Sequence, residues 1–339
     1  MIKSKGYFLT RYSDASSSFK LLDFNLNLPS NTQVLIEVEA FGLNYADVMA
    51  RKGLYQEAPP TPCILGYEVV GKILKVGSEV EEKWIGKRVV GFCRFGGYAT
   101  HVLTEIDAVC EINNISLDYA LALATQYVTA YYMVEHAANI QEGEQVLIHA
   151  AAGGVGTALI QLCKLKKAHI IAKVSNDQKE KITLELGANQ TINYTKQAYN
   201  QALDTKIDVS FNPIGGKTFK TDLSLLDANG RLVLFGGSEL SNKWGIFSKL
   251  NFVRKMGMII PIGLMMQSKS VLGVNMLRIA DKKPLILARC LRAVVQLAEE
   301  GKITPIIGGT YKHTSLAEAH ELLESGKSVG KINVHWNEN

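Results

Sequence analysis

The chain has 339 residues, 47% of them hydrophobic, and a formal net charge of +5. This length exceeds what one hydrophobic core normally organises, so two domains are expected. The positive charge is dispersed, which gives no reason to propose nucleic acid as a partner, and no segment reaches the roughly 20 apolar residues that span a bilayer.

The five cysteines are scattered and form no C-x-x-C pair: Cys63, Cys93, Cys110, Cys163 and Cys290. An odd, dispersed set of cysteines is typical of reduced thiols in protein cores, and it argues against both a disulfide framework and a four-cysteine zinc site. The N-terminal residues do not resemble a signal peptide either. We therefore expect a cytoplasmic protein.

The first 115 residues are predominantly β-forming. Apolar and charged residues alternate from 34 to 41, and segments 69–76 and 87–92 are rich in β-branched residues, with glycines between them. Short strands punctuated by glycine are typical of a small barrel. From Leu117 to Ala138 the apolar periodicity is helical, which leads into a different kind of domain.

Residues 145–164 carry the most informative pattern of the chain. An apolar run is followed by the small residues of 151–156 and then by helical periodicity. Such a turn needs glycine because a side chain would keep a pyrophosphate away from the N–H groups at the start of the helix. Ala151, Gly153 and Gly156 fit the dinucleotide-binding spacing, with alanine in first place. The alternative is a glycine-rich turn without a ligand, which the flanking strand and helix disfavour.

Strands and helices then alternate. Strands are expected at 169–174, 191–194, 207–211 and 231–235, and helices at 177–186 and 217–226. This order predicts a Rossmann unit, a doubly wound parallel sheet. Helices at 284–300 and 316–325 and a strand at 331–334 follow it. The predicted domains are residues 1–122 with 281–339, and residues 123–280.

Several motifs together carry a family resemblance. Segment 42–55 has Asn, Asp, Arg, Gly and Tyr at fixed spacing, and it is followed by Pro62, Gly66-x-Glu68-x-x-Gly71, Gly96-Gly97-Tyr98-Ala99 and Thr129-Ala130-Tyr131. With the turn at 150–156, they resemble the medium-chain dehydrogenase/reductase family, specifically its zinc-independent quinone oxidoreductase branch. Segment 126–131 and the region after Gly237 are most similar to the vesicle amine transport protein-like group. The resemblance implies an α/β fold with a GroES-like small β-barrel catalytic domain beside the Rossmann domain, and we expect a homodimer.

The differences from zinc-dependent relatives indicate the chemistry. Those relatives carry Cys where this chain has Leu43-Asn44-Tyr45, and His at the position of Tyr67. Zinc needs three or four such ligands, so no metal site is expected. Hydride transfer to a quinone or an α,β-unsaturated carbonyl spreads charge by conjugation and needs no Lewis acid. The inferred activity is that of an NADPH:quinone oxidoreductase or enone reductase, and an enoyl thioester is the alternative acceptor.

The end of the second strand of the predicted sheet bears on the coenzyme. NAD-specific folds place an acidic residue about 20 residues after the glycine turn. Here the strand ends at Ser175, with Lys173 and Lys179 on either side, which favours the 2′-phosphate of NADPH. Asp177 is expected to cap the following helix. The resemblance assigns Lys179 and Tyr194 to phosphate or adenosine contacts.

Other site residues follow from the resemblance. Thr129 is expected to contact the nicotinamide amide, and Asn44 to lie near the nicotinamide and the substrate carbonyl. The remaining coenzyme contacts are Gly153, Gly154, Val155, Gly156, Phe235, Gly237 and Ser238. The candidate donors to a substrate oxygen are Tyr45, Tyr55 and Tyr67, which could alternatively be aromatics packed at a domain boundary. Asp47 and Arg51 are expected to form an ion pair that orders their loop.

The segment from Leu240 to Gln267 is apolar and basic. It contains Trp244, a basic patch at Lys249, Arg254 and Lys255, and the apolar run 258–266. We interpret it as a subunit contact or a cover of the substrate cleft. The alternative is peripheral contact with anionic lipid, to which Met-rich surface beside Lys and Arg can adsorb. A second functional class therefore stays open: a coenzyme-binding protein that associates with membranes or partners and has weak reductase activity.

Overall fold

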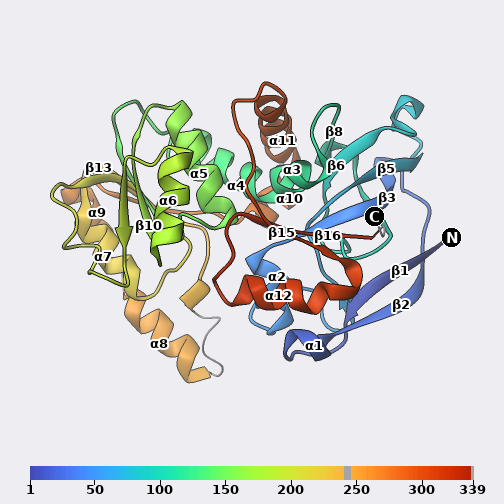
Figure 1. Cartoon of the computed structure of the whole chain (residues 1–339), viewed down its shortest axis with the longest axis horizontal. Helices are drawn as coiled ribbons and strands as arrows, with labels where there is room; N and C mark the ends of the chain where they lie inside the picture. Colours follow the sequence, from blue (N-terminus) through green and yellow to red (C-terminus); the bar gives the residue numbers. More distant parts are fainter. Residues whose placement is uncertain (240–245, 258, 337–339) are drawn as a thin grey trace. The chain divides into compact units, whose positions relative to one another are not determined.

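The computed structural model describes residues 1–239, 246–257 and 259–336. The chain divides into two compact units, drawn in Figure 1. Unit 1 is Met1–Val128 with Met276–Asn339, and unit 2 is Thr129–Asn275. The sequence places the corresponding boundaries at residues 122 and 281, a few residues away in each case.

Unit 1 is built on two β-sheets. The larger has the strand order β15-β16-β3-β5-β6-β8, with β7 paired to β3, and the smaller has the order β2-β1-β4. The strands are β1 (Ile2–Leu9), β2 (Phe19–Leu26), β3 (Gln33–Leu43), β4 (Cys63–Ile64), β5 (Glu68–Val76), β6 (Arg88–Phe92), β7 (His101–Glu105), β8 (Val109–Glu111), β15 (Ile307–Lys312) and β16 (Lys331–His335).

The central strand of unit 1 is β3. It pairs antiparallel with β5, β7 and β16, and its side chains are buried at most positions on both faces. The expected strand at 34–41 is thus confirmed and extended to Leu43. The strand β16 pairs with the end of β3, from Ala40 to Leu43. It therefore lies beside the residues that lead directly to Asn44, one of the candidate site residues.

Short helices connect and cover these sheets. They are α1 (Ala15–Ser18), α2 (Tyr45–Arg51), α3 (Leu117–Ala122), α10 (Met276–Lys282), α11 (Pro284–Glu299) and α12 (Leu316–Glu324), with 3-10 turns η1 (Glu82–Trp84), η2 (Ile106–Ala108) and η6 (His313–Ser315). The helical stretch expected at 117–138 is present, but it includes the π-helical segments η3 (Leu123–Tyr127) and η4 (Tyr132–Ala137) around α4 (Val128–Tyr131).

Unit 2 contains a six-stranded parallel sheet of order β11-β10-β9-β12-β13-β14. Its strands are β9 (Gln145–Ile148), β10 (His169–Val174), β11 (Gln190–Asn193), β12 (Ile207–Asn212), β13 (Leu226–Leu234) and β14 (Ser270–Gly273). Its helices are α5 (Gly154–Leu165), α6 (Asp177–Leu186), α7 (Lys217–Leu225), α8 (Ile246–Met256) and α9 (Pro261–Gln267). The chain leaves β9 toward β10 and returns to its other side at β12, which confirms the doubly wound sheet.

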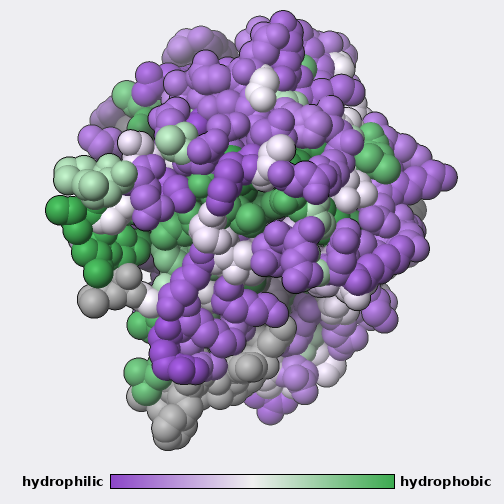
Figure 2. All heavy atoms as spheres, turned by 90° about the vertical axis from the view of Figure 1, so that its left-hand side faces the viewer, coloured by the Kyte–Doolittle hydropathy of each residue, from purple (hydrophilic) through white to green (hydrophobic). Residues whose placement is uncertain are grey.

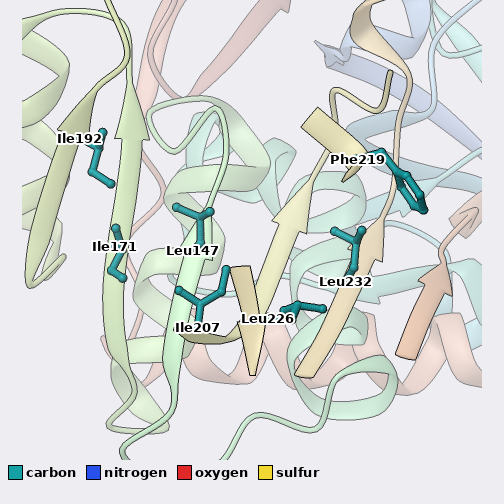
Figure 3. Close-up of a cluster of buried hydrophobic side chains, with 7 residues drawn as sticks. All are labelled: Leu147, Ile171, Ile192, Ile207, Phe219, Leu226 and Leu232. Atoms are coloured by element: carbon teal, nitrogen blue, oxygen red, sulfur yellow. The ribbon is translucent and has the colours of Figure 1, made fainter. Parts of the chain in front are cut away.

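One apolar core of unit 2 lies between this sheet and α7. Figure 3 shows seven buried side chains that form one apolar cluster: Leu147, Ile171, Ile192, Ile207, Phe219, Leu226 and Leu232. All except Phe219 come from β-strands, and Phe219 comes from α7. Burial of this apolar surface is the main force that stabilises the sheet whose strand β9 leads into the glycine turn.

The predicted apolar and basic segment lies partly outside the described residues, including Trp244 and Met258. Of the rest, α9 and its approach expose large apolar side chains, among them Ile262 and Met266, which are 60% and 77% exposed. Figure 2, which views the side of the molecule that is on the left in Figure 1, shows a mostly hydrophilic surface with a hydrophobic patch at its left edge. No helix among the described residues is long and apolar enough to cross a membrane.

Candidate functional site

The glycine turn of unit 2 has the geometry of a phosphate-binding turn. β9 ends at Ile148, Gly153 is the N-cap of α5, and the Gly153 N–H donates to Ala150 O at 2.9 Å. Ala150 adopts a left-handed conformation with φ of 49°, which folds the chain back toward the helix. The Ala151 N–H donates to Lys173 O at 3.2 Å, so the turn is also attached to the neighbouring strand β10.

Two glycines of this turn have different roles. A Cβ at Gly156 would lie 2.4 Å from Ala150 O and 2.6 Å from Ala151 O, so the helix can approach the strand only with glycine there. A Cβ at Gly153 would meet only Ala150 O, at 3.2 Å. Gly153, Gly154 and Val155 are partly exposed, and the first N–H groups of a helix have no acceptor within it. The turn therefore fits a pyrophosphate.

Other predicted coenzyme residues lie at the same edge of the sheet, where the parallel strands end. Ser175 follows β10, and Phe235, Gly237 and Ser238 follow β13. The Phe235 N–H donates to Asn212 O and the Ser238 N–H to Pro213 O, which ties this segment to the end of β12. Thr129 lies in α4 and is partly buried.

The expected cap of α6 is wrong by one residue. The N-cap is Asn176, whose side chain accepts from the Lys179 N–H at 2.9 Å. Asp177 instead pairs with Lys196 at 2.5 Å and accepts from Asn193 at 3.0 Å. Asn and Asp are equally good caps, so the sequence does not distinguish adjacent candidates.

The two residues assigned to the phosphate or adenosine differ in exposure. Lys179 is 8% exposed, and burial lowers its pKa. Tyr194 follows β11 and is half exposed. Because Lys179 is already buried, in the helix that follows β10, it loses little further hydration when it binds an anionic group.

A buried polar network beside the glycine turn was not predicted. His149, the residue after β9, lies 3.1 Å from Asp222 Oδ1 through Nε2 and 3.2 Å from Lys173 Nζ through Nδ1. Because an ammonium only donates, Nδ1 is the acceptor and Nε2 carries the proton that Asp222 accepts. Lys173 Nζ also lies 3.8 Å from the centroid of the Tyr199 ring.

Burial and hydrogen-bond donors determine the pKa values of the ionisable groups in this network. Burial lowers the pKa of His149 and lowers that of Lys173 to about 8. Burial alone would raise the pKa of Asp222, but His149 and hydrogen bonds from Tyr199 and Ser210 outweigh it and lower this pKa. The sequence associates Lys173 with the 2′-phosphate of NADPH, but its side chain is buried and bonded to His149.

The candidate site of unit 1 surrounds Asn44, the N-cap of α2. Asn44 Nδ2 donates to Glu68 Oε1 at 2.7 Å, and Lys331 Nζ donates to Asn44 Oδ1 at 3.3 Å. Lys331 also forms an ion pair with Glu68, and both side chains are fully buried. The sequence motif includes Glu68, but nothing in the sequence indicates that Lys331 is its partner.

The expected ion pair between Asp47 and Arg51 is wrong. The Asp47 carboxylate accepts from the backbone N–H groups of Asn44 at 2.8 Å and Gly66 at 3.2 Å, and burial raises its pKa to about 7. Arg51 pairs with Glu324 of α12. Spacing of four residues favours a helical pair, but Asp47 points back over the start of α2 as part of a capping box.

Two of the three candidate tyrosines lie together in unit 1. The rings of Tyr55 and Tyr67 meet edge to face with centroids 6.4 Å apart, and Tyr67 also packs on Phe95. Tyr67 is 4% exposed, and its hydroxyl makes no hydrogen bond of normal geometry in the described part of the chain, although the neighbouring Tyr55 phenol is close enough to influence its pKa. Burial raises the pKa of both phenols, so they stay protonated and able to donate. Tyr45 starts α2 and is partly buried.

The described residues include no group of three or more His, Cys, Asp or Glu side chains placed to hold a metal ion.

Comparison with known proteins matches both units. Residues 30–135 match the alcohol dehydrogenase GroES-like domain, and residues 186–334 match the model described as zinc-binding dehydrogenase. The mouse quinone oxidoreductase-like protein 2 is 30% identical over 307 residues, 88% of this chain and 84% of that protein. The zebrafish synaptic vesicle membrane protein VAT-1 homolog is 28% identical over 88% of this chain and 63% of its own length.

A solved structure agrees with these relatives. The Escherichia coli quinone oxidoreductase complexed with NADPH superimposes with a TM-score of 0.85 at 27% identity, over 98% of this chain and 99% of that one. Sequence and fold therefore lead to the same conclusion: the chain belongs to the medium-chain dehydrogenase/reductase family of oxidoreductases, in its quinone oxidoreductase-like group.

Proposed function

We propose that this protein is a zinc-independent, NADPH-dependent reductase of quinones or α,β-unsaturated carbonyls. NADPH supplies a hydride to the acceptor when it is bound. The observation that carries the proposal is the buried Tyr67 hydroxyl, which makes no hydrogen bond of normal geometry among the described residues and lies in the unit that also holds Asn44.

The proposed role of unit 2 is to bind the coenzyme. The N–H groups at the start of α5 would bind the pyrophosphate, since Gly153 leaves room for it. Lys179 and Tyr194 would contact the phosphorylated adenosine, and the absence of an acidic side chain at Ser175 favours NADPH over NADH. Thr129, Phe235, Gly237 and Ser238 are proposed to line the rest of the coenzyme.

The proposed role of unit 1 is to stabilise the oxygen of the acceptor. Negative charge develops on this oxygen as hydride reaches a conjugated carbon, and fixed N–H or O–H donors stabilise it. Asn44 and Tyr67 are proposed as these donors, and Tyr55 and Tyr45 as neighbours that shape the acceptor site. Burial keeps the Tyr67 phenol protonated, as a donor must be.

The test is a screen of NADPH oxidation against quinones, enones, enals and enoyl thioesters, with NADH in parallel. We expect turnover with at least one conjugated acceptor and a preference for NADPH. Turnover restricted to enoyl thioesters would favour the alternative activity, and no turnover with any acceptor would refute the reductase.

One observation favours a second candidate function. The side chains of α9 expose apolar area, and β14 is the edge strand of its sheet among the described residues; both features are suited to association. Our preferred proposal is that these features form the contact between the two subunits of a homodimer. The other candidate is a coenzyme-binding protein that adsorbs to anionic lipid, although Lys255 of the basic patch is already paired with Glu239. Liposome flotation of the wild type and of a variant with polar residues at Ile262 and Met266 distinguishes the two.

A further inference from the structure

The side-chain amide of Asn44 lies between two buried groups of opposite charge. Lys331 of β16 and Glu68 of β5 are both fully buried and form an ion pair. Lys331 Nζ also donates to Leu43 O at 3.0 Å and to Asn44 Oδ1 at 3.3 Å. On the other side of the amide, Asn44 Nδ2 donates to Glu68 Oε1 at 2.7 Å.

The chemistry of these partners determines which way the amide faces. An ammonium can only donate hydrogen bonds, and an ionised carboxylate can only accept them. The oxygen of Asn44 must therefore face Lys331, and its nitrogen must face Glu68. The reversed amide would place N–H against ammonium and C=O against carboxylate, which are two repulsive contacts instead of two attractive ones.

One polar group of the amide then remains for a ligand. The oxygen of Asn44 is held by Lys331 and also faces the Asp47 N–H in the capping box at the start of α2. One hydrogen of Nδ2 is bonded to Glu68. The second hydrogen of Nδ2 is thus what Asn44 can offer, and it is a donor.

Gly42 makes room for the ion pair. A Cβ at this position would lie 2.4 Å from Glu68 Oε1 and 2.4 Å from Lys331 Cε. Gly42 lies on β3, between the strands that carry the two charges, and pairs with Asn333 of β16. The ion pair therefore occupies space that only glycine leaves at position 42, two residues before Asn44.

We propose that Lys331 is a positioning residue: together with Glu68 it holds the Asn44 amide so that its free N–H donates to the carbonyl oxygen of the acceptor. This role rests on the proposed reductase function. Lys331 is itself 0% exposed, so it acts through Asn44 and not on the acceptor. A fixed donor is stabilising because charge grows on that oxygen during hydride transfer, whereas a freely turning amide presents its oxygen part of the time.

The kinetic test is a double-mutant cycle. Lys331→Met with Glu68→Leu removes both charges at similar volume, a replacement of a buried ion pair that stability often tolerates. We expect Asn44→Ala to lower kcat roughly 100-fold, as loss of one donor to a developing oxyanion does. The charge-pair variant should lose about 10-fold in kcat with little change in KM for NADPH, and it should lose nothing further when Asn44 is already alanine.

A matched control and a second perturbation accompany the cycle. Lys327→Met removes an exposed lysine of the same C-terminal segment and should leave kcat unchanged. Gly42→Ala displaces the ion pair without removing either charge, and it replaces the charge-pair variant if that variant does not fold. It should show the same loss of kcat as the charge-pair variant.

A spectroscopic measurement separates this inference from the proposed function. In protein labelled with 15N-asparagine, the Asn44 side-chain signals are those that disappear in Asn44→Ala. We expect two well-separated, slowly exchanging amide protons in the wild type, which collapse together in the folded charge-pair or Gly42 variant. Unchanged Asn44 signals, or additive losses in the cycle, would overturn the role of Lys331. A wild type that reduces no acceptor would refute the reductase, while the spectra would still decide whether Lys331 orients Asn44.

Discussion

His149 and Asp222 form a buried hydrogen bond that joins the start of the coenzyme turn to α7, 73 residues further along the chain. Both side chains are fully buried. Lys173 binds the other nitrogen of His149, so the neutral imidazole lies between an ammonium and a carboxylate. The network therefore links the end of β9 to β10 and to α7.

The network predicts a specific pH dependence of stability. Burial lowers the pKa of Lys173 in the folded protein to about 8, below its ordinary value of 10.5. Below about pH 8 both states hold the proton and the cost of the buried charge is fully present. As pH rises from about 8 to 10.5 the unfolded chain binds more protons, so this lysine makes the free energy of unfolding rise, by on the order of 3 kcal/mol.

Lys173→Met should remove that rise. Urea unfolding across this pH range is the measurement, with Lys167→Met as the control because Lys167 is 72% exposed. The same rise in wild type and Lys173→Met would show that another group causes it.

Gly153→Val and Gly156→Ala should fail in different ways. A side chain at Gly153 makes one tight contact, 3.2 Å from its Cβ to Ala150 O, and it blocks the approach of a pyrophosphate, so NADPH binding is lost with a smaller loss of thermal stability than in Gly156→Ala. A methyl at Gly156 collides with two backbone carbonyls and should cost roughly 1–3 kcal/mol of stability. Nucleotide titration and thermal unfolding of both variants check this, and normal NADPH affinity in Gly153→Val would contradict the assigned turn.

Lys179→Ala should weaken NADPH binding much more than NADH binding. Only NADPH offers a 2′-phosphate for a charge-assisted contact, which is worth about 1.5–3 kcal/mol. Lys181→Ala is the matched control, since Lys181 is on the same helix and 80% exposed. Calorimetric Kd values for both coenzymes provide the measurement; equal losses would remove Lys179 from the phosphate site.

Tyr67→Phe should lower kcat without loss of stability. The hydroxyl makes no hydrogen bond of normal geometry in the described part of the chain, so its removal leaves no broken hydrogen bond, while a donor to the acceptor is lost. Tyr199→Phe offers the opposite case, because its hydroxyl donates to Asp222 at 2.7 Å and its loss should cost about 1–2 kcal/mol. If Tyr67→Phe keeps full kcat, Tyr67 is a packing residue only.

Metal content is a further test of the proposed chemistry. Because Leu43-Asn44-Tyr45 and Tyr67 stand where zinc-dependent relatives carry Cys and His, we expect no stoichiometric zinc in the purified protein and no loss of activity with a chelator. Elemental analysis before and after chelation is the measurement. About one tightly bound zinc per chain that activity requires would overturn the proposed mechanism.

Local patterns in the sequence determined much of unit 2. The strand at 169–174 and the helix at 177–186 have the bounds that their apolar spacing and flanking residues predict, because both signals act within a few residues. The glycine turn was predictable for the same reason. Strands such as β4 and β8, with two and three residues, carry too little periodicity to be recognised.

Only the tertiary structure decided which charged groups meet. Lys331 and Glu68 are 263 residues apart, and Arg51 and Glu324 are 273 apart. A pattern in the sequence gives the face and the spacing of a side chain along its own element, but partners on other elements depend on strand order and register. Asp47 shows the consequence: its helical spacing from Arg51 was real, yet the packing of α12 supplied Arg51 with another carboxylate and left Asp47 to the backbone of Asn44 and Gly66.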